Sequence, residues 1–227
     1  MLCAGRLDSF EERNEDRMMR TKKGLAFIDG GLLLLAAALL LTGYNLWDSW
    51  RAKEEAGKIA AVLESHMDSQ EKEMDKKDVP ADSSRTDEQE EITAVVIDKE
   101  NYFGMLEIPS LRLELPVMGE WSYPKLRIAP CRYTGSVYQN DMIIAGHNYD
   151  SHFGRLKKLQ AGDEIRFTDV HGITYFYKVI SQEILEKNAV EQIKKGGWDL
   201  TLFTCTIGGS RRIAVRCKRM DTPEISL

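Results

Sequence analysis

The sequence predicts an all-β domain with one or two short helices, preceded by an N-terminal membrane-spanning helix. Two observations lead to this fold class. Stretches of apolar and β-branched residues of strand length recur between residues 92 and 220, enough for about seven or eight strands, and such a number of short strands indicates a closed or nearly closed barrel. An apolar segment without any charge precedes them, from residue 30 to residue 47.

The predicted transmembrane anchor covers residues 24–47. About 20 apolar residues, each rising 1.5 Å, cross a hydrocarbon core of roughly 30 Å. Basic residues are concentrated in the preceding segment, 1–23, which predicts a cytoplasmic N-terminus and an extracellular remainder. A cleaved signal peptide is the alternative. Against it, residues 43–47 lack a small-residue cleavage pattern, and Tyr44 and Trp47 suit a membrane interface.

Residues 48–91 are predicted to form a charged stalk, partly helical and partly disordered. In its first part, alanines and larger apolar residues recur at helical spacing between Ala52 and Met67. This stripe either continues the membrane helix outward or pairs weakly with another chain. Residues 74–91 are too polar to support a core. Residues 221–227 form a short tail after the predicted domain.

Within residues 92–220, apolar patterns predict strands at 111–117, 142–145, 164–167 and 173–180, followed by two terminal strands. Helical spacing is rare in this part of the chain. Residues 152–160 place Phe153, Leu156 and Leu159 on one face of a short predicted helix. Residues 189–195 can form a turn or two of helix.

The most informative segment is 200–205, which is predicted to be a buried strand that ends in Cys205. Residues 208–210, Gly-Gly-Ser, break the run, and Arg211 and Arg212 open the next strand. A neighbouring guanidinium can stabilise a thiolate and the oxyanion that forms when the thiolate attacks a carbonyl. The alternative is an inert cysteine in the core.

His147 is the candidate base. It ends a short apolar strand, 142–145, after Gly146, where a ring can be presented to a cleft. A neutral imidazole accepts a thiol proton, and an imidazolium donates one to a leaving amine. A structural histidine is the alternative. The other histidines are weaker candidates, since His66 lies in the stalk, His171 in a turn and His152 at the start of the short predicted helix.

These motifs resemble those of the sortase family, the membrane-anchored cysteine transpeptidases of Gram-positive bacteria. Residues 201–205 resemble the family's Thr-Leu-x-Thr-Cys signature, Gly146-His147 its histidine strand, and residues 212–215 its arginine strand. Residues 104–117 are similar to the opening strands, so the resemblance covers roughly residues 92–220. It implies an eight-stranded barrel whose seventh and eighth strands carry the cysteine and the arginine.

The resemblance also implies a reaction. Cys205 would attack a peptide bond in the C-terminal sorting signal of a surface protein, and His147 would protonate the departing amine. An amine of a cell-wall precursor, or a lysine of another protein, would then resolve the thioester on Cys205. Arg212 would bind the oxyanion or the substrate backbone, and Thr204 and Arg211 are expected to contribute to substrate binding.

Strand alternation directs Arg211 and Arg212 to opposite faces, so only one of them can reach Cys205. Residues 213–215 match the register of the family's arginine strand, and this resemblance favours Arg212, although a register slip of one residue would exchange the two arginines.

No cofactor or metal is expected. The sequence lacks Cys-x-x-Cys pairs, the usual zinc-ligand spacing and an assignable calcium loop. A bridge between Cys131 and Cys217 stays open. The net charge of −5 and the absence of a basic patch give no indication of nucleic-acid binding. Two other functions remain possible, namely a hydrolytic cysteine peptidase on the same scaffold and a membrane-tethered β-barrel binding module without activity.

Overall fold

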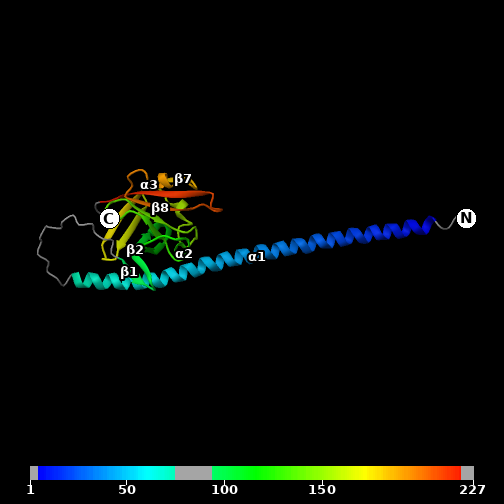
Figure 1. The fold of residues 1–227 in the computed structure, drawn as a ribbon, viewed down its shortest axis with the longest axis horizontal. Helices are drawn as coiled ribbons and strands as arrows, with labels where there is room; N and C mark the ends of the chain where they lie inside the picture. The colour runs from blue at the N-terminus through cyan, green and yellow to red at the C-terminus, as the bar shows by residue number, and fades with distance from the viewer. Residues whose placement is uncertain (1–4, 75–93, 221–227) are drawn as a thin grey trace. The chain divides into compact units, whose positions relative to one another are not determined.

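The computed structural model describes the backbone of residues 5–74 and 94–220, and the side chains of residues 27–67 and 94–220 (Figure 1). Residues 75–93, which include the rest of the stalk predicted at 48–91, and the predicted tail, 221–227, lie outside the described residues. The chain divides into two compact units, Met1–Asp48 and Ser49–Leu227, which are considered separately below.

The second unit contains a closed barrel of eight strands, as the sequence predicts. Each strand is hydrogen-bonded to the next in the order β2-β3-β4-β5-β8-β9-β7-β6, and a pairing of β6 with β2 closes the ring. β1 is an additional strand that pairs only with β2. The bounds are β1 (Val95–Ile97), β2 (Glu100–Ile108), β3 (Leu113–Met118), β4 (Cys131–Thr134), β5 (Met142–Ala145), β6 (Glu164–Asp169), β7 (Thr174–Glu186), β8 (Leu200–Cys205) and β9 (Arg211–Arg219).

Apart from the long N-terminal helix α1 (Gly5–Met74), the described helices are short: η1 (Pro109–Leu111), α2 (Tyr123–Leu126), η2 (Leu156–Lys158) and α3 (Val190–Lys194). The helix predicted at 189–195 is confirmed as α3. The helix predicted at 152–160 is wrong, because its first part is a set of tight turns and only η2 is helical. The N–H of Gly154 donates to the carbonyl of Tyr149, five residues earlier, and that of Leu156 donates to Phe153, three residues earlier. Neither spacing is that of an α-helix.

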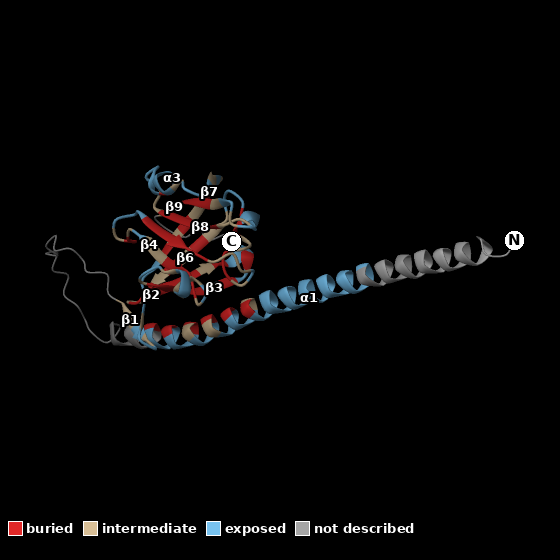
Figure 2. Cartoon of the chain, turned by 45° about the vertical axis from the view of Figure 1, so that its right-hand side comes forward, coloured by how far each residue is buried: buried red, intermediate tan, exposed pale blue. Residues whose placement is uncertain are grey.

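The main core fills the barrel. Alternating residues of the strands point inward, among them Ile144 of β5, Leu202 of β8 and Val215 of β9, all of which are fully buried. Phe153, from the turns after β5, joins the same cluster. Figure 2 shows the buried stretches of the strands in red.

A second, smaller core lies between the barrel and the part of α1 that belongs to the same unit. Ala52, Ala56, Ala60, Leu63 and Met67 form a buried stripe along the helix. Three of them pack in one cluster with barrel residues; the members of that cluster are Ala60, Leu63, Met67, Tyr102, Met105, Met118, Ala129, Cys131 and Val170.

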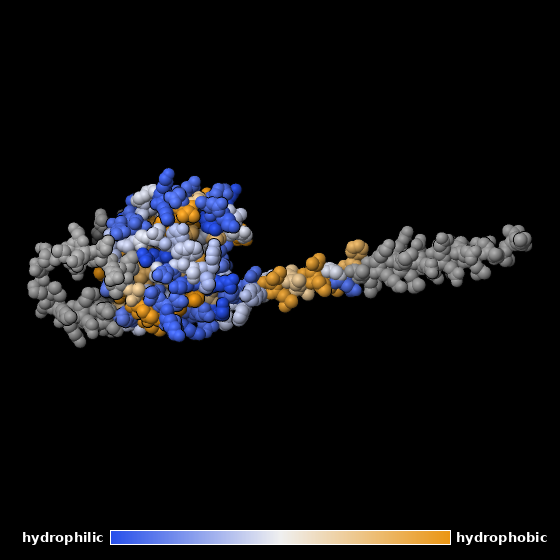
Figure 3. All heavy atoms as spheres, in the orientation of Figure 1, coloured by the Kyte–Doolittle hydropathy of each residue, from blue (hydrophilic) through white to orange (hydrophobic). Residues whose placement is uncertain are grey.

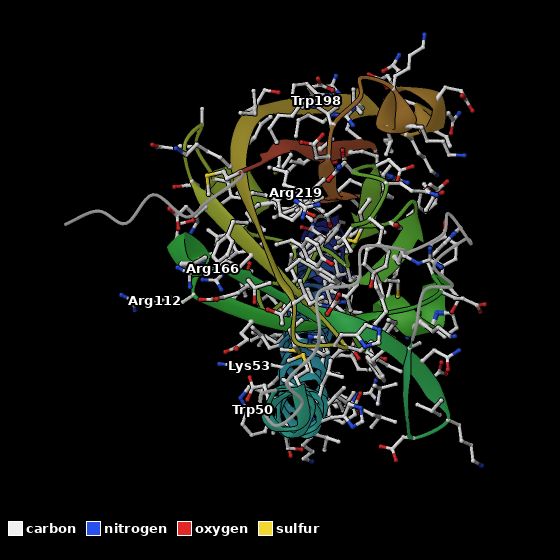
Figure 4. All side chains as sticks on the ribbon, turned by 90° about the vertical axis from the view of Figure 1, so that its left-hand side faces the viewer. Trp50, Lys53, Arg112, Arg166, Trp198 and Arg219 are labelled. Carbon is white, nitrogen blue, oxygen red and sulfur yellow. The ribbon has the colours of Figure 1, made fainter. Side chains whose placement is uncertain are left out.

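The stripe predicted from helical spacing therefore continues the helix outward and packs against the barrel. Trp50, which precedes the stripe, and Lys53, which lies between two stripe positions, are exposed (Figure 4). The hydroxyl of Ser151 also donates to the carbonyl of Ser49 at 3.3 Å, which ties the start of this helical part to the turns after β5.

Among the described residues, one helical segment, Phe27–Met67, contains a stretch long and apolar enough to cross a membrane. Its large apolar side chains before residue 47, coloured orange in Figure 3, are exposed. A helix that is apolar on all sides is stable in lipid. Its apolar side chains need no hydrogen bonds there, and its backbone groups are hydrogen-bonded within the helix.

Candidate active site

Strand β8 ends in Cys205, the candidate nucleophile. Strand β8 lies between β5, to which it is parallel, and β9, to which it is antiparallel. Leu200, Leu202 and Thr204 are buried, and the two leucines belong to the barrel core. Alternation therefore places Cys205 on the outer face of the strand, where it is half-buried.

The register of β5 and β8 brings His147 beside Cys205. Ala145 is the partner of Phe203, and the N–H of Gly146 donates to the Phe203 carbonyl at 3.0 Å. Because the strands are parallel, two further residues along each chain bring His147 next to Cys205 on the same face. Both residues are half-buried. The two groups singled out in the sequence thus lie at the same end of neighbouring strands, each two residues beyond the Ala145–Phe203 pair.

Thr204 holds the peptide before His147 from inside the barrel. Its hydroxyl donates to the carbonyl of Gly146 at 2.9 Å, and the residue is only 1% exposed. A Cβ atom at Gly146 would lie 2.3 Å from the ring of Phe153, so the close approach of that ring requires glycine. The side chain of Thr204 therefore supports the strand end, and a contact with a substrate is open only to its backbone.

Arg212 is the direct register partner of Cys205 across the β8–β9 pair. Residues directly opposite each other have their side chains on the same face, with Cβ atoms about 5 Å apart. The guanidinium Nη1 donates to the carbonyls of Gly209 at 3.2 Å and Arg211 at 3.1 Å. Carbonyl groups of the turn between the strands thus hold the guanidinium of Arg212.

Arg211 occupies the other face of β9. It is the register partner of Glu186 in β7 and forms an ion pair with its carboxylate at 3.7 Å. Both side chains are well exposed, so water screens this pair and its contribution to stability is small. Its backbone N–H donates to the hydroxyl of Thr206 at 3.1 Å, which helps to close the turn.

Arg216 is a third arginine of β9, on the same face as Arg212, and sequence reasoning did not single it out. It is 1% exposed. It donates to the carbonyls of Gln192 and Ile193 in α3, each at 2.6 Å, and to the carboxylate of Glu183 at 3.1 Å. These bonds fix α3 over the sheet. Arg216 is the register partner of Thr201, so Arg212 is the arginine that pairs with Cys205.

The two other cysteines of the domain are unsuited to nucleophilic chemistry. Cys131 and Cys217 are fully buried, and neither is in a disulfide. Burial raises the pKa of Cys131 to about 12 and raises the pKa of Cys217 as well. Both therefore remain thiols at neutral pH, and a thiol is a far weaker nucleophile than a thiolate.

Tyr149 stacks on His147. The ring centroids are 3.9 Å apart and the ring planes are inclined by 22°. His152 lies against Tyr149 in turn, with centroids 5.5 Å apart. His152 is fully buried, and burial, with a smaller contribution from the charge of His147, lowers its pKa to about 4. The backbone of Leu126 opposes this shift, although it makes no hydrogen bond of ordinary geometry with the ring nitrogens of His152.

The burial of His152 predicts acid-sensitive stability. Its pKa is about 4 in the folded protein and about 6.5 in the unfolded chain, so between these values only the unfolded chain binds the proton. The free energy of unfolding should therefore fall as the pH drops from 6.5 to 4, by about 3 kcal/mol from this residue. Denaturant unfolding at a series of pH values should show a smaller fall for His152→Phe. Parallel curves for the two proteins would contradict this assignment.

An aromatic surface adjoins Cys205. Phe203, two residues earlier on the same face, meets Tyr133 edge-on with ring centroids 5.4 Å apart, and Tyr133 meets Trp121 at 5.5 Å. Beside these rings lies a hollow of ≈ 360 Å³. It is lined by Gly119, Glu120, Trp121, Arg132, Tyr133 and Thr134. These positions do not recur at the spacing of a helix or a strand, so the sequence pattern could not predict that they form one surface.

Among the residues whose side chains are described, no three histidine, cysteine or acidic side chains lie close enough together to hold a metal ion. The strand register associates the thiol of Cys205 with the guanidinium of Arg212 and with the imidazole of His147. Such a set suits nucleophilic attack on a carbonyl followed by proton transfer. Cys205 and its register partner Arg212 lie on the outer face of the closed barrel.

Comparison with known proteins identifies the family. The model of the sortase domain matches residues 106–220, and the chain belongs to the sortase family. It is 26% identical to "Sortase A" of Bacillus anthracis over 201 residues, which cover 85% of this chain and 89% of that protein. It is 23% identical to "Sortase D" of Bacillus subtilis (strain 168) over 182 residues, 77% of this chain and 86% of that protein.

Solved structures agree with the fold. Sortase C1 from Streptococcus agalactiae is 27% identical and superposes with a TM-score of 0.50 over 56% of this chain and 72% of that chain. Sortase C1 of GBS pilus island 1 is 20% identical, with a TM-score of 0.51 over 79% of this chain and 86% of that chain. Sortases are cysteine transpeptidases of cell-wall sorting, and family membership together with the apolar helix indicates membrane anchoring.

Proposed function

We propose that this protein is a cysteine transpeptidase that cleaves the C-terminal sorting signal of surface proteins and transfers the acyl group to an amine. The observation that carries the proposal is the strand register, in which Arg212 is the partner of Cys205 and His147 follows the paired part of β5 on the same face. This register supports the roles assigned here to Cys205 as nucleophile, His147 as acid–base group and Arg212 as fixed positive charge.

In the first half-reaction, the thiolate of Cys205 attacks the carbonyl carbon of the scissile peptide bond, and a C–S bond forms. Negative charge develops on the carbonyl oxygen, where the Arg212 guanidinium can donate hydrogen bonds. The C–N bond then breaks, and the departing amine takes a proton from the His147 imidazolium. A thioester remains on Cys205. Arg212 cannot serve as the base, since a guanidinium stays protonated at any relevant pH.

In the second half-reaction, an acceptor amine attacks the thioester and passes a proton to the neutral imidazole of His147. The C–S bond breaks, an amide forms, and the thiolate of Cys205 is regenerated. The acceptor is an amine of a cell-wall precursor or a lysine of another protein. The aromatic surface of Phe203, Tyr133 and Trp121 lies next to the thiol and offers apolar contacts to the bound chains.

The test is product analysis with the full-length protein in detergent. A library of C-terminal sorting peptides is incubated with and without an added amine, and products are separated by mass. Amide products that appear only with the amine support transfer. Hydrolysis products alone, even with the amine present, would favour the hydrolytic peptidase. An unreactive Cys205 and no product would favour a binding module.

We further propose a single-pass topology with a cytoplasmic N-terminus and an extracellular catalytic domain. The basic residues before the apolar segment support this orientation. Protease added to intact protoplasts should therefore remove the chain after about Trp47 and leave a short membrane-bound fragment. A domain that survives protease until the membrane is permeabilised would show the opposite orientation. A known cytoplasmic protein in the same sample reports on membrane integrity.

A further inference from the structure

The turn that follows His147 has a shape that ordinary strand geometry does not produce. The N–H of Phe153 donates to the carbonyl of His147 at 3.1 Å, and the N–H of Gly154 donates to the carbonyl of Tyr149 at 2.8 Å. A Cβ at Gly154 would lie 2.8 Å from the Tyr149 oxygen, so only glycine permits this closure. The chain is thus folded back on itself immediately after the candidate base.

This turn brings together two rings that an extended chain keeps apart. Residues two positions apart along a strand are about 6.6 Å from each other. The rings of His147 and Tyr149 are instead in face contact, with centroids 3.9 Å apart and an angle of 22° between the planes. A flat contact of this kind restricts rotation of the imidazole about its ring torsion, which is otherwise broad.

His152 supports Tyr149 from a second direction. It is fully buried, and neither ring nitrogen has a hydrogen-bond partner of ordinary geometry among the described residues. Because burial lowers its pKa to about 4, the ring is neutral near pH 7 and packs as an uncharged, flat aromatic ring. The N–H of His152 donates to the carbonyl of Tyr149 at 3.0 Å, so backbone and ring of this residue both contact Tyr149.

We propose that Tyr149 is a positioning residue for His147, and that His152 holds Tyr149 in place. The inference deepens the proposed function, because it rests on His147 being the acid–base group. With its ring plane fixed, the imidazole presents the same nitrogen toward Cys205 in both half-reactions. Tyr149 takes no part in bond making, so its aromatic ring matters and its hydroxyl does not.

The kinetic test compares Tyr149→Phe with Tyr149→Leu in the full-length protein. Phenylalanine keeps the flat ring and leucine removes it. Single-turnover acylation of Cys205 by a sorting peptide should be within about twofold of wild type for the phenylalanine variant and about tenfold or more slower for the leucine variant, the scale of a misoriented catalytic group. In steady-state transfer with an added amine, the effect should appear in kcat with KM nearly unchanged. Equal loss in both variants, or wild-type rates in both, would overturn the proposal.

A second measurement detects the stacking of the His147 and Tyr149 rings in protein without substrate. The chain has four histidines, so histidine labelled with ¹³C in its ring gives a spectrum that single substitutions can assign. A ring proton over the face of Tyr149 resonates upfield. This upfield shift of His147 should persist in Tyr149→Phe and vanish in Tyr149→Leu, while the His171 signal, from a distant turn, stays unchanged and reports on folding. An unshifted His147 signal in the wild type would contradict the stacking of His147 on Tyr149. Failure of wild-type acyl transfer, by contrast, would overturn the proposed function.

Discussion

Replacement of Cys205 by alanine should abolish acyl transfer while the barrel remains folded. Cys205 lies at the end of β8 on the outer face, and it is the one described cysteine that is not buried in a core. Loss of the nucleophile should lower turnover of a sorting peptide by roughly 10⁴-fold or more. Peptide cleavage followed by mass analysis measures this, and circular dichroism checks the fold.

The matched controls are Cys131→Ala and Cys217→Ala. Both residues are fully buried, and the pKa of each thiol is raised by burial, so neither supplies a thiolate at neutral pH. These variants should retain the chemistry of the wild type, with any loss confined to stability. Substantial acyl transfer by the Cys205→Ala protein would refute the mechanism.

Arg212→Ala should slow formation of the acyl-enzyme by roughly 10² or more, the scale of losing one oxyanion donor. Arg212 is the register partner of Cys205 on the same face, and a turn carbonyl accepts a hydrogen bond from its guanidinium. Arg211 faces the other side and pairs with Glu186 at the surface, so Arg211→Ala should have a small effect. Single-turnover acylation of both variants makes the comparison.

The opposite ranking of the two arginine variants would assign the oxyanion role to Arg211. Arg212→Lys refines the test, because lysine keeps the charge and loses the planar pair of donors. We expect only partial recovery with lysine. Full recovery would mean that charge alone is needed at this position.

The closed barrel could be predicted from sequence because its strands have strong local apolar and β-branched patterns and are numerous enough to close a sheet. The pairing of Arg212 with Cys205 could be predicted only to within one residue, since the turn after Cys205 can shift the register. Once β8 and β9 are paired, the buried positions of Leu202 and Val215 fix that register.

Other parts of the site depend on tertiary contacts that leave no periodic signal. The turns after β5 carry apolar residues at helical spacing, yet their hydrogen bonds follow another pattern, so a helix was expected there. For the same reason the stack of Tyr149 on His147 could not be anticipated. The stripe between Ala52 and Met67 indicated a packed helix face, but spacing alone does not reveal the barrel as its partner.

The central claim is that the reaction passes through a thioester on Cys205. Mass spectrometry of the intact protein, mixed with a sorting peptide in the absence of an amine, tests it most directly. We predict one added acyl group per chain, located on Cys205 by peptide mapping, absent from Cys205→Ala and released as an amide when an amine is added. Product formation without any adduct on Cys205, or with the acyl group on another residue, would contradict the account.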